Sequence, residues 1–173
     1  MSFQFFHSPA NGAKPLNIKA LGLGLAVRVA PAETGSELTI LETVNAAGFG
    51  PPLHRHRETE IFRVLAGRYL FQVDDRQFEA GEGDVVCVPG GIAHAFVNIS
   101  DGPARQLVLM LPGMDAQAFF LGLSEVLETN PSRDDLNAFG KSWGVEFLGP
   151  PLSVARVAPR GAASSGEGVN KGG

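Results

Sequence analysis

The sequence predicts an all-β barrel or sandwich followed by a short helical segment, on the strength of three observations. The 173 residues are 44% hydrophobic, which is enough for one domain with a sizeable core. Glycine (22 residues) and proline (12 residues) divide the chain into short segments, as is typical of all-β folds. Between residues 16 and 111 those segments are rich in strand-forming residues, whereas after residue 113 apolar residues recur at helical spacing.

Each predicted strand lies between turn-forming residues. The first two are expected at Leu16–Ala30 and Glu37–Val44, where Leu, Ile and Val are frequent. The cluster Gly48–Pro52 then interrupts the pattern, because proline cannot donate a hydrogen bond to a sheet. Further short strands are expected at Glu60–Ala66, Arg68–Val73, Gln77–Ala80, Val85–Val88, Ala95–Ile99 and Arg105–Leu111.

Two helices are expected in the C-terminal part of the chain. The first follows Asp115, a suitable N-terminal cap, and ends at Asn130. The second begins at Ser132, which forms a capping-box pattern with Asp135, and ends at Gly144. The apolar residues at helical spacing are Met114, Phe119, Phe120, Leu123, Val126, Leu127, Leu136, Phe139 and Trp143. We interpret this apolar side as packing against the barrel; the alternative is a lid over a bound ligand.

These patterns define a single domain over residues 1–157. It comprises a barrel over residues 16–111 and a helical extension over residues 113–149. Residues 158–173 are expected to form a flexible tail, because the stretch from Arg160 onward contains five glycines and no large aromatic residue.

Composition and charge argue against several classes of function. The formal net charge of −4 disfavours a nucleic-acid-binding protein. No apolar run reaches the roughly 18 residues of a membrane-spanning helix, and the N-terminus lacks the pattern of a signal peptide. The only cysteine, Cys87, cannot form an internal disulfide and fits a cytoplasmic protein. Because it lies inside an apolar strand, Cys87 is expected to be a small buried residue rather than a nucleophile.

Three of the four histidines combine with a glutamate into a pattern that suits a metal ion, whereas His7 lies apart. His54 and His56 are two residues apart, so on a strand they point to the same face. Glu60 has the same parity, and His94 follows a Pro-Gly-Gly turn onto another strand. Imidazole and carboxylate groups suit Zn, Fe, Ni, Mn or Cu. The alternative is a set of surface histidines within a charged patch, because charged residues occupy positions 55, 57 and 58; the spacing leaves both interpretations open.

Two blocks of the sequence resemble the two motifs of the cupin family. The matched positions are Gly48, His54, His56, Glu60 and Gly67 in the first block and Gly83, Pro89, Gly91, His94 and Asn98 in the second. The 15 residues between the blocks resemble the short spacing of small microbial cupins. On these positions the chain is similar to single-domain bacterial cupins, including those with a quercetinase-like barrel.

The resemblance implies a double-stranded β-helix, or jelly-roll barrel, that binds one divalent metal ion per chain. The implied ligands are His54, His56, Glu60 and His94, and the ion would be Fe, Ni, Mn, Zn, Co or Cu. In the comparison with quercetinase, Glu60 also serves as the catalytic base. Glu58 is a rival carboxylate, but it misses the spacing of the family motif.

Strand parity suggests which residues line a pocket beside these ligands. Phe62 and Val64 share the parity of Glu60, and Phe96 and Asn98 share that of His94. An apolar pocket around a polar centre is typical of a small-molecule site. The alternative for each apolar residue is ordinary barrel core, and Asn98 is expected to bond a neighbouring strand.

Three functions are compatible with such a centre. The favoured one is a mononuclear metal-dependent dioxygenase, an oxidoreductase acting on a small enol, diketone or aromatic (flavonol-like) substrate. The alternatives are a non-oxidative metal-dependent isomerase or lyase, and a small-ligand binding or sensing protein without turnover. We expect a small-molecule partner, no nucleic acid and no membrane, and a homodimer formed through the edge strand Leu16–Ala30.

Overall fold

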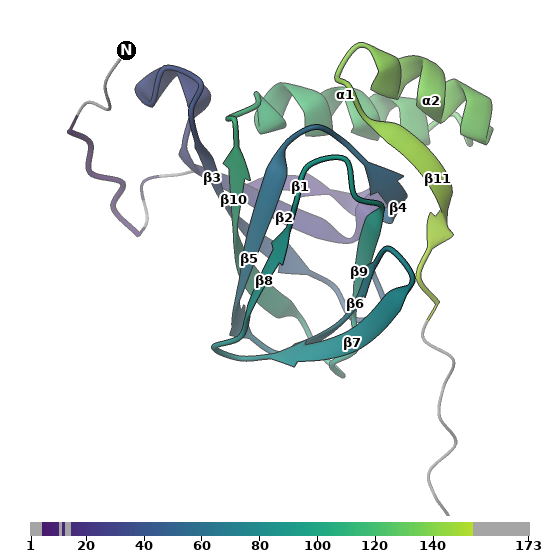
Figure 1. Cartoon of the computed structure of the whole chain (residues 1–173), viewed down its shortest axis with the longest axis horizontal. Helices are drawn as coiled ribbons and strands as arrows, with labels where there is room; N and C mark the ends of the chain where they lie inside the picture. Colours follow the sequence, from purple (N-terminus) through teal and green to yellow (C-terminus); the bar gives the residue numbers. More distant parts are fainter. Residues whose placement is uncertain (1–4, 11, 13–14, 154–173) are drawn as a thin grey trace, which may run out of the picture.

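Two antiparallel β-sheets face each other in the computed structural model, which describes residues 5–10, 12 and 15–153. The strands are β1 (Leu16–Ile18), β2 (Leu23–Val29), β3 (Thr39–Asn45), β4 (Pro52–Arg55), β5 (Thr59–Ala66), β6 (Arg68–Val73), β7 (Arg76–Gly81), β8 (Val85–Val88), β9 (His94–Asn98), β10 (Ala104–Leu111) and β11 (Glu146–Pro151). One sheet has the order β1-β2-β3-β10-β5-β8 and the other β11-β4-β9-β6-β7. The chain is therefore an all-β jelly-roll barrel, as predicted (Figure 1).

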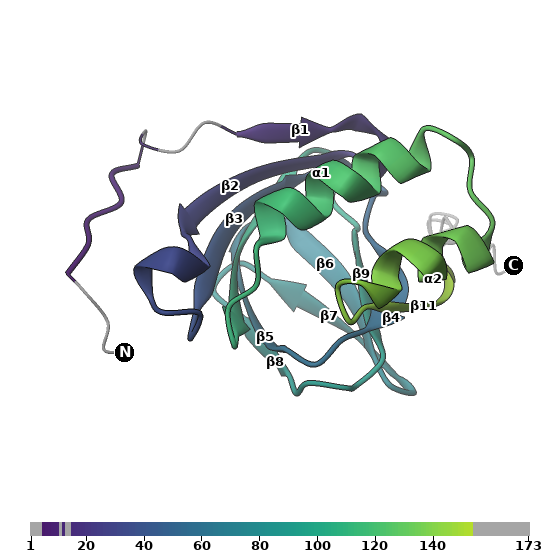
Figure 2. The ribbon, with the colours of Figure 1, turned by 90° about the horizontal axis from the view of Figure 1, so that it is seen from above.

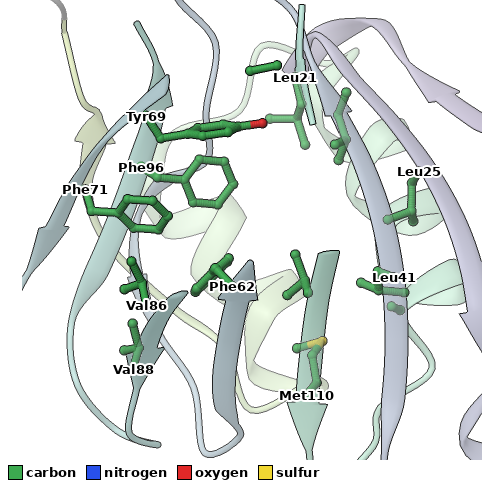
Figure 3. Packing of buried hydrophobic residues seen from close by; sticks show 14 of the residues in the cluster. Leu21, Leu25, Leu41, Phe62, Tyr69, Phe71, Val86, Val88, Phe96 and Met110 are labelled. Atoms are coloured by element: carbon green, nitrogen blue, oxygen red, sulfur yellow. The ribbon is translucent and has the colours of Figure 1, made fainter. Parts of the chain in front are cut away.

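The barrel interior is filled because alternate residues of each strand point inward. Along β10, for example, Ala104, Gln106, Val108 and Met110 are buried, while most of the intervening residues reach the outer surface. Figure 3 shows the aromatic side of this core, with Phe62, Tyr69, Phe71 and Phe96, facing an aliphatic side that includes Leu25, Leu41 and Met110. The phenyl rings of Phe62 and Phe96 lie 5.6 Å apart in an edge-to-face arrangement.

The N-terminal apolar segment forms a hairpin, so the prediction of one strand over Leu16–Ala30 is wrong. β1 is followed by the 3-10 turn η1 (Lys19–Leu21), and β2 returns antiparallel to β1. Gly22 makes this return possible, because its φ of +52° lies in the left-handed region that favours glycine. β1 lies at the edge of its sheet, and the homodimer remains a prediction.

The C-terminal extension contains both predicted helices and a strand that the prediction of a helical extension omits. Helix α1 (Ala116–Leu127) and helix α2 (Arg133–Lys141) lie over one end of the barrel (Figures 1 and 2). Asp115 caps α1 by accepting a hydrogen bond from the Ala118 amide over 3.0 Å. After α2 the chain re-enters the barrel as β11, which pairs with β4. None of the described helices is long and apolar enough to cross a bilayer. The predicted tail, residues 158–173, lies entirely outside the described residues, as do residues 154–157.

Cys87 is exposed, so its predicted burial is wrong. β8 lies at the edge of its sheet, and its inward positions are taken by Val86 and Val88. The period-two alternation therefore turns Val85 and Cys87 outward. All four residues of Val85–Val88 are apolar, so the sequence does not show which alternate pair faces the core.

Replacing Ser132 with alanine is expected to destabilise the fold by about 1 kcal/mol, because the capping box at the start of α2 would be lost. The Ser132 amide donates to the Asp135 carboxylate over 2.9 Å, and the Asp135 amide donates to the Ser132 hydroxyl over 3.2 Å. Thermal unfolding measures the effect, with the exposed Ser153→Ala as the control. Equal stability of the two variants would contradict the role of this cap.

Candidate metal centre

The fold brings the three histidines and Glu60 of the two motif blocks together. His54 of β4 pairs in register with His94 of β9. β4 ends at Arg55, so His56 lies just beyond the strand rather than on it, and Glu60 is the second residue of β5. One potential ligand atom from each of the four side chains lies within 4.8 Å of the others.

Backbone carbonyls orient two of the three imidazoles. Nδ1 of His54 lies 2.8 Å from the carbonyl oxygen of Pro52, and Nδ1 of His94 lies 2.9 Å from that of Ile92. A carbonyl oxygen only accepts hydrogen bonds, so Nδ1 carries the proton in both rings. Nε2 of His54 and Nε2 of His94 are therefore left with a free lone pair in the neutral form, as a metal ligand requires.

Burial and mutual contact shift the pKa values of the cluster in opposite directions. Burial, together with the neighbouring His94 and against the opposing charge of Glu60, lowers the pKa of His54 to about 3. Burial also lowers the pKa of His56, but contacts with Glu58 and Glu60 outweigh it and raise this pKa to about 9. For Glu60, burial raises the pKa, whereas the contacts with His56 and His94 outweigh it and hold the pKa well below its usual range. Glu60 is therefore ionised beside an imidazolium.

Unsatisfied polar atoms show that the cluster fits a cation. Both ring nitrogens of His56 are buried without a well-aligned hydrogen bond, although buried polar groups in proteins are nearly always paired. Oε2 of Glu60 lies 3.5 Å from Nε2 of His56 and 2.9 Å from Nε2 of His94. Neighbouring ligand atoms on a single ion, each about 2.1 Å away, stand roughly 3.0–3.4 Å apart. The group can therefore hold one metal ion, and the burial of His56, Glu60 and His94 does not fit a charged surface patch.

The affinity for such an ion is expected to rise with pH, because a metal must displace the proton of His56. With the pKa of His56 at about 9, the ring is mostly protonated at neutral pH. The apparent affinity should therefore increase about tenfold per pH unit from pH ~7 and level off above this pKa. Competition with a chelator, measured at several pH values with Zn²⁺, checks this slope. A flat profile across that range would contradict it.

A mostly apolar cavity of about 90 Å³ adjoins the cluster. Its lining includes Leu21, Leu23, Leu41, Thr43, Asn45, His54, His56, Glu60, Phe62, Phe96, Val108, Met110, Met114, Phe119, Phe120, Leu123, Val145 and Phe147. Of the four residues that parity suggested, Phe62 and Phe96 belong to this lining and Val64 and Asn98 do not. Val64 is buried in the core. The side-chain amide of Asn98 donates to the main-chain carbonyls of Asn45 and Gly102, so this side chain joins neighbouring segments.

Several cavity residues come from the C-terminal extension. Phe119 and Leu123 of α1 both pack into the core and line the cavity, so the two interpretations of this helix are not exclusive. Phe147 belongs to β11, where it pairs with His54. Their approach depends on how the extension crosses the barrel, which no local pattern specifies.

Comparisons with known proteins agree with this architecture. The cupin domain family matches residues 40–110. An uncharacterized protein of Methanocaldococcus jannaschii is 30% identical over 79 residues, or 45% of this chain and 63% of that protein's length.

Among solved structures, an RmlC-like cupin from Shewanella frigidimarina has a TM-score of 0.57 and 19% identity, covering 66% of this chain and 97% of its own. A predicted oxalate decarboxylase from Thermotoga maritima has a TM-score of 0.58 and 18% identity, covering 62% of this chain and 99% of its own. These solved structures share the jelly-roll fold of this chain. Together with the motif positions, the family match identifies residues 40–110 as a cupin domain.

Proposed function

We propose that this protein is a mononuclear metal-dependent dioxygenase that acts on a compact enol or diketone. The observation that carries the proposal is a buried group of three histidines and one glutamate beside an apolar cavity. When bound, a redox-active divalent metal supplies Lewis acidity and an electron path between an enolate and O₂. The four ligands would leave a divalent ion with one net positive charge, which favours an anionic oxygen ligand.

The lining favours an apolar substrate with a single polar end. Apart from the His and Glu ligands, most of the cavity is formed by aliphatic and aromatic side chains, and the described lining contains no Lys or Arg. A small dicarboxylate would therefore find no cation to pair its second charge. The volume of about 90 Å³ is also below the 300–1,000 Å³ typical of drug-sized ligands, so a compact diketone fits better than a flavonol.

Glu60 limits which proton the site can remove. Its contacts with His56 and His94 keep its pKa low, so it is ionised and able to accept a proton. A carboxylate with a low pKa is a weak base, and proton transfer to it is efficient only from an acidic group. The acidic hydroxyl of an enol meets this requirement, whereas an ordinary carbon acid does not. Phe62 and Phe96 would exclude water from the apolar part of the same substrate.

Elemental analysis and oxygen uptake test the proposal. The protein is purified without a metal-affinity tag, its metal content is measured, and O₂ consumption is followed with acetylacetone and with quercetin. We expect about one redox-active ion per chain and faster uptake with acetylacetone. Zinc at the same stoichiometry with no uptake, even after reconstitution with iron or nickel, would replace the proposal by non-oxidative chemistry or ligand sensing. Absence of any bound metal would overturn the dioxygenase proposal and both metal-dependent alternatives.

A further inference from the structure

The third histidine of the cluster is oriented differently from the other two. Nδ1 of His54 and Nδ1 of His94 each face a main-chain carbonyl two residues earlier in the sequence. Nδ1 of His56 instead faces a carboxylate, with Oε2 of Glu58 at 3.2 Å. His56 is therefore the only ring of the three whose outer nitrogen meets a negatively charged group among the described contacts.

Glu58 is held in a way that is unusual for a carboxylate. Its side chain is only 2% exposed, although burial of a charge is costly unless the charge is paired. Oε1 accepts a hydrogen bond from Nε of Arg57 over 2.9 Å, while the Arg57 side chain is 74% exposed. Oε2 has no partner other than the imperfectly aligned contact with His56. One oxygen thus reaches a surface guanidinium, and the other is directed at a metal-ligand candidate.

The backbone around Glu58 is fixed by the loop that precedes β9. The Gly91 amide donates to the His56 carbonyl over 2.6 Å. A side chain on Gly90 would approach the Arg57 carbonyl oxygen to 2.0 Å, so only glycine permits this contact. Backbone contacts between the two motif blocks therefore fix the placement of Glu58 beside His56.

We propose that Glu58 is a positioning residue of the metal centre: its carboxylate accepts a hydrogen bond from the Nδ1–H of His56 and thereby directs Nε2 of this ring at the ion. A carboxylate behind a histidine ligand fixes its tautomer and raises its donor strength. The negative charge of Glu58 is paired with the Arg57 guanidinium, so a divalent ion with Glu60, Glu58 and Arg57 keeps one net positive charge. The inference rests on the metal centre of the proposed function.

Cobalt binding to Glu58→Gln tests this role. The substitution preserves the shape of the side chain but removes its charge, and Co²⁺ affinity, measured by chelator competition, is expected to fall 10- to 100-fold. Glu58→Asp retains the charge and should recover part of this loss. The control is Glu79→Gln, which removes an exposed carboxylate paired with Arg68 at 3.4 Å and leaves the cluster untouched. Its affinity should stay within about twofold of the parent chain.

A spectroscopic readout separates positioning from a general loss of stability. At saturating Co²⁺, the visible ligand-field bands of Glu58→Gln should differ from those of the parent chain, because the donor strength of His56 changes. Should this variant fail to fold, ¹⁵N NMR of the zinc-loaded parent chain decides: the inference requires a protonated Nδ1 on His56. If Glu58→Gln had the Co²⁺ affinity and visible bands of the parent chain, or if Nδ1 of His56 carried no proton, the role of Glu58 would be overturned. The metal centre itself would not be affected by either result. A parent chain that binds neither Co²⁺ nor Zn²⁺ would overturn the proposed function as well.

Discussion

Replacing His94 with alanine is expected to weaken metal binding by more than about 100-fold, because loss of a ligand costs more than the 10- to 100-fold typical of its supporting residues. The ring is 3% exposed and contacts Glu60 over 2.9 Å, so alanine also deprives the carboxylate of a partner. Metal content after dialysis and chelator competition measure the loss, and His54→Ala should behave alike.

The control for this prediction is His7→Ala, because His7 is exposed and lies outside the cluster. Circular dichroism of the metal-free variants shows whether each chain remains folded. A folded His94→Ala or His54→Ala chain with full metal occupancy would exclude the assigned ligand set. A loss of metal in His7→Ala would show that the effect is not specific to the centre.

Replacing Gly50 with alanine is expected to destabilise the protein by at least about 3 kcal/mol, at the upper end of the usual cost of overpacking. A Cβ atom at this position would lie 1.7 Å from the carbonyl oxygen of Phe96, and main-chain atoms cannot yield as a flexible side chain can. Two main-chain hydrogen bonds hold the segment before β4 against β9 at this point. The Gly48 amide donates to the Asn98 carbonyl over 2.9 Å, and the main-chain amide of Asn98 donates to the Phe49 carbonyl over 3.1 Å.

Gly50→Ala should also reduce metal affinity, because β4 and β9 carry the paired residues His54 and His94. Denaturant unfolding of the metal-free chain gives the stability change, and zinc titration gives the affinity. The matched control is Gly81→Ala, where an added Cβ meets no atom within 4 Å and φ is not in the left-handed region. It should change stability by less than about 0.5 kcal/mol. Similar effects of the two substitutions would show that contact with β9 is not what requires glycine.

Strand parity predicted only some of the residues that surround the metal centre. Strand parity placed His54 and His56 on one strand, yet β4 ends between them, and His56 reaches the cluster from the chain that follows. Parity also placed Val64 and Asn98 at the pocket, but both serve the core and its hydrogen bonds instead. Parity specifies a face of the sheet and says little about depth along the barrel, so it could not separate these residues from Phe62 and Phe96.

The sequence by itself determined the all-β class, the positions of most strands and both helices, and the identity of the four residues that can hold a metal ion. These features follow from local propensity, period-two alternation and motif spacing, all of which are properties of short segments. Only the tertiary structure decided that β11 pairs with β4, that α1 lines the cavity, that Cys87 faces outward and that Glu58 is directed at His56. Each of these depends on contacts between segments distant in the chain or on which side of an edge strand packs inward, and no local pattern encodes that choice.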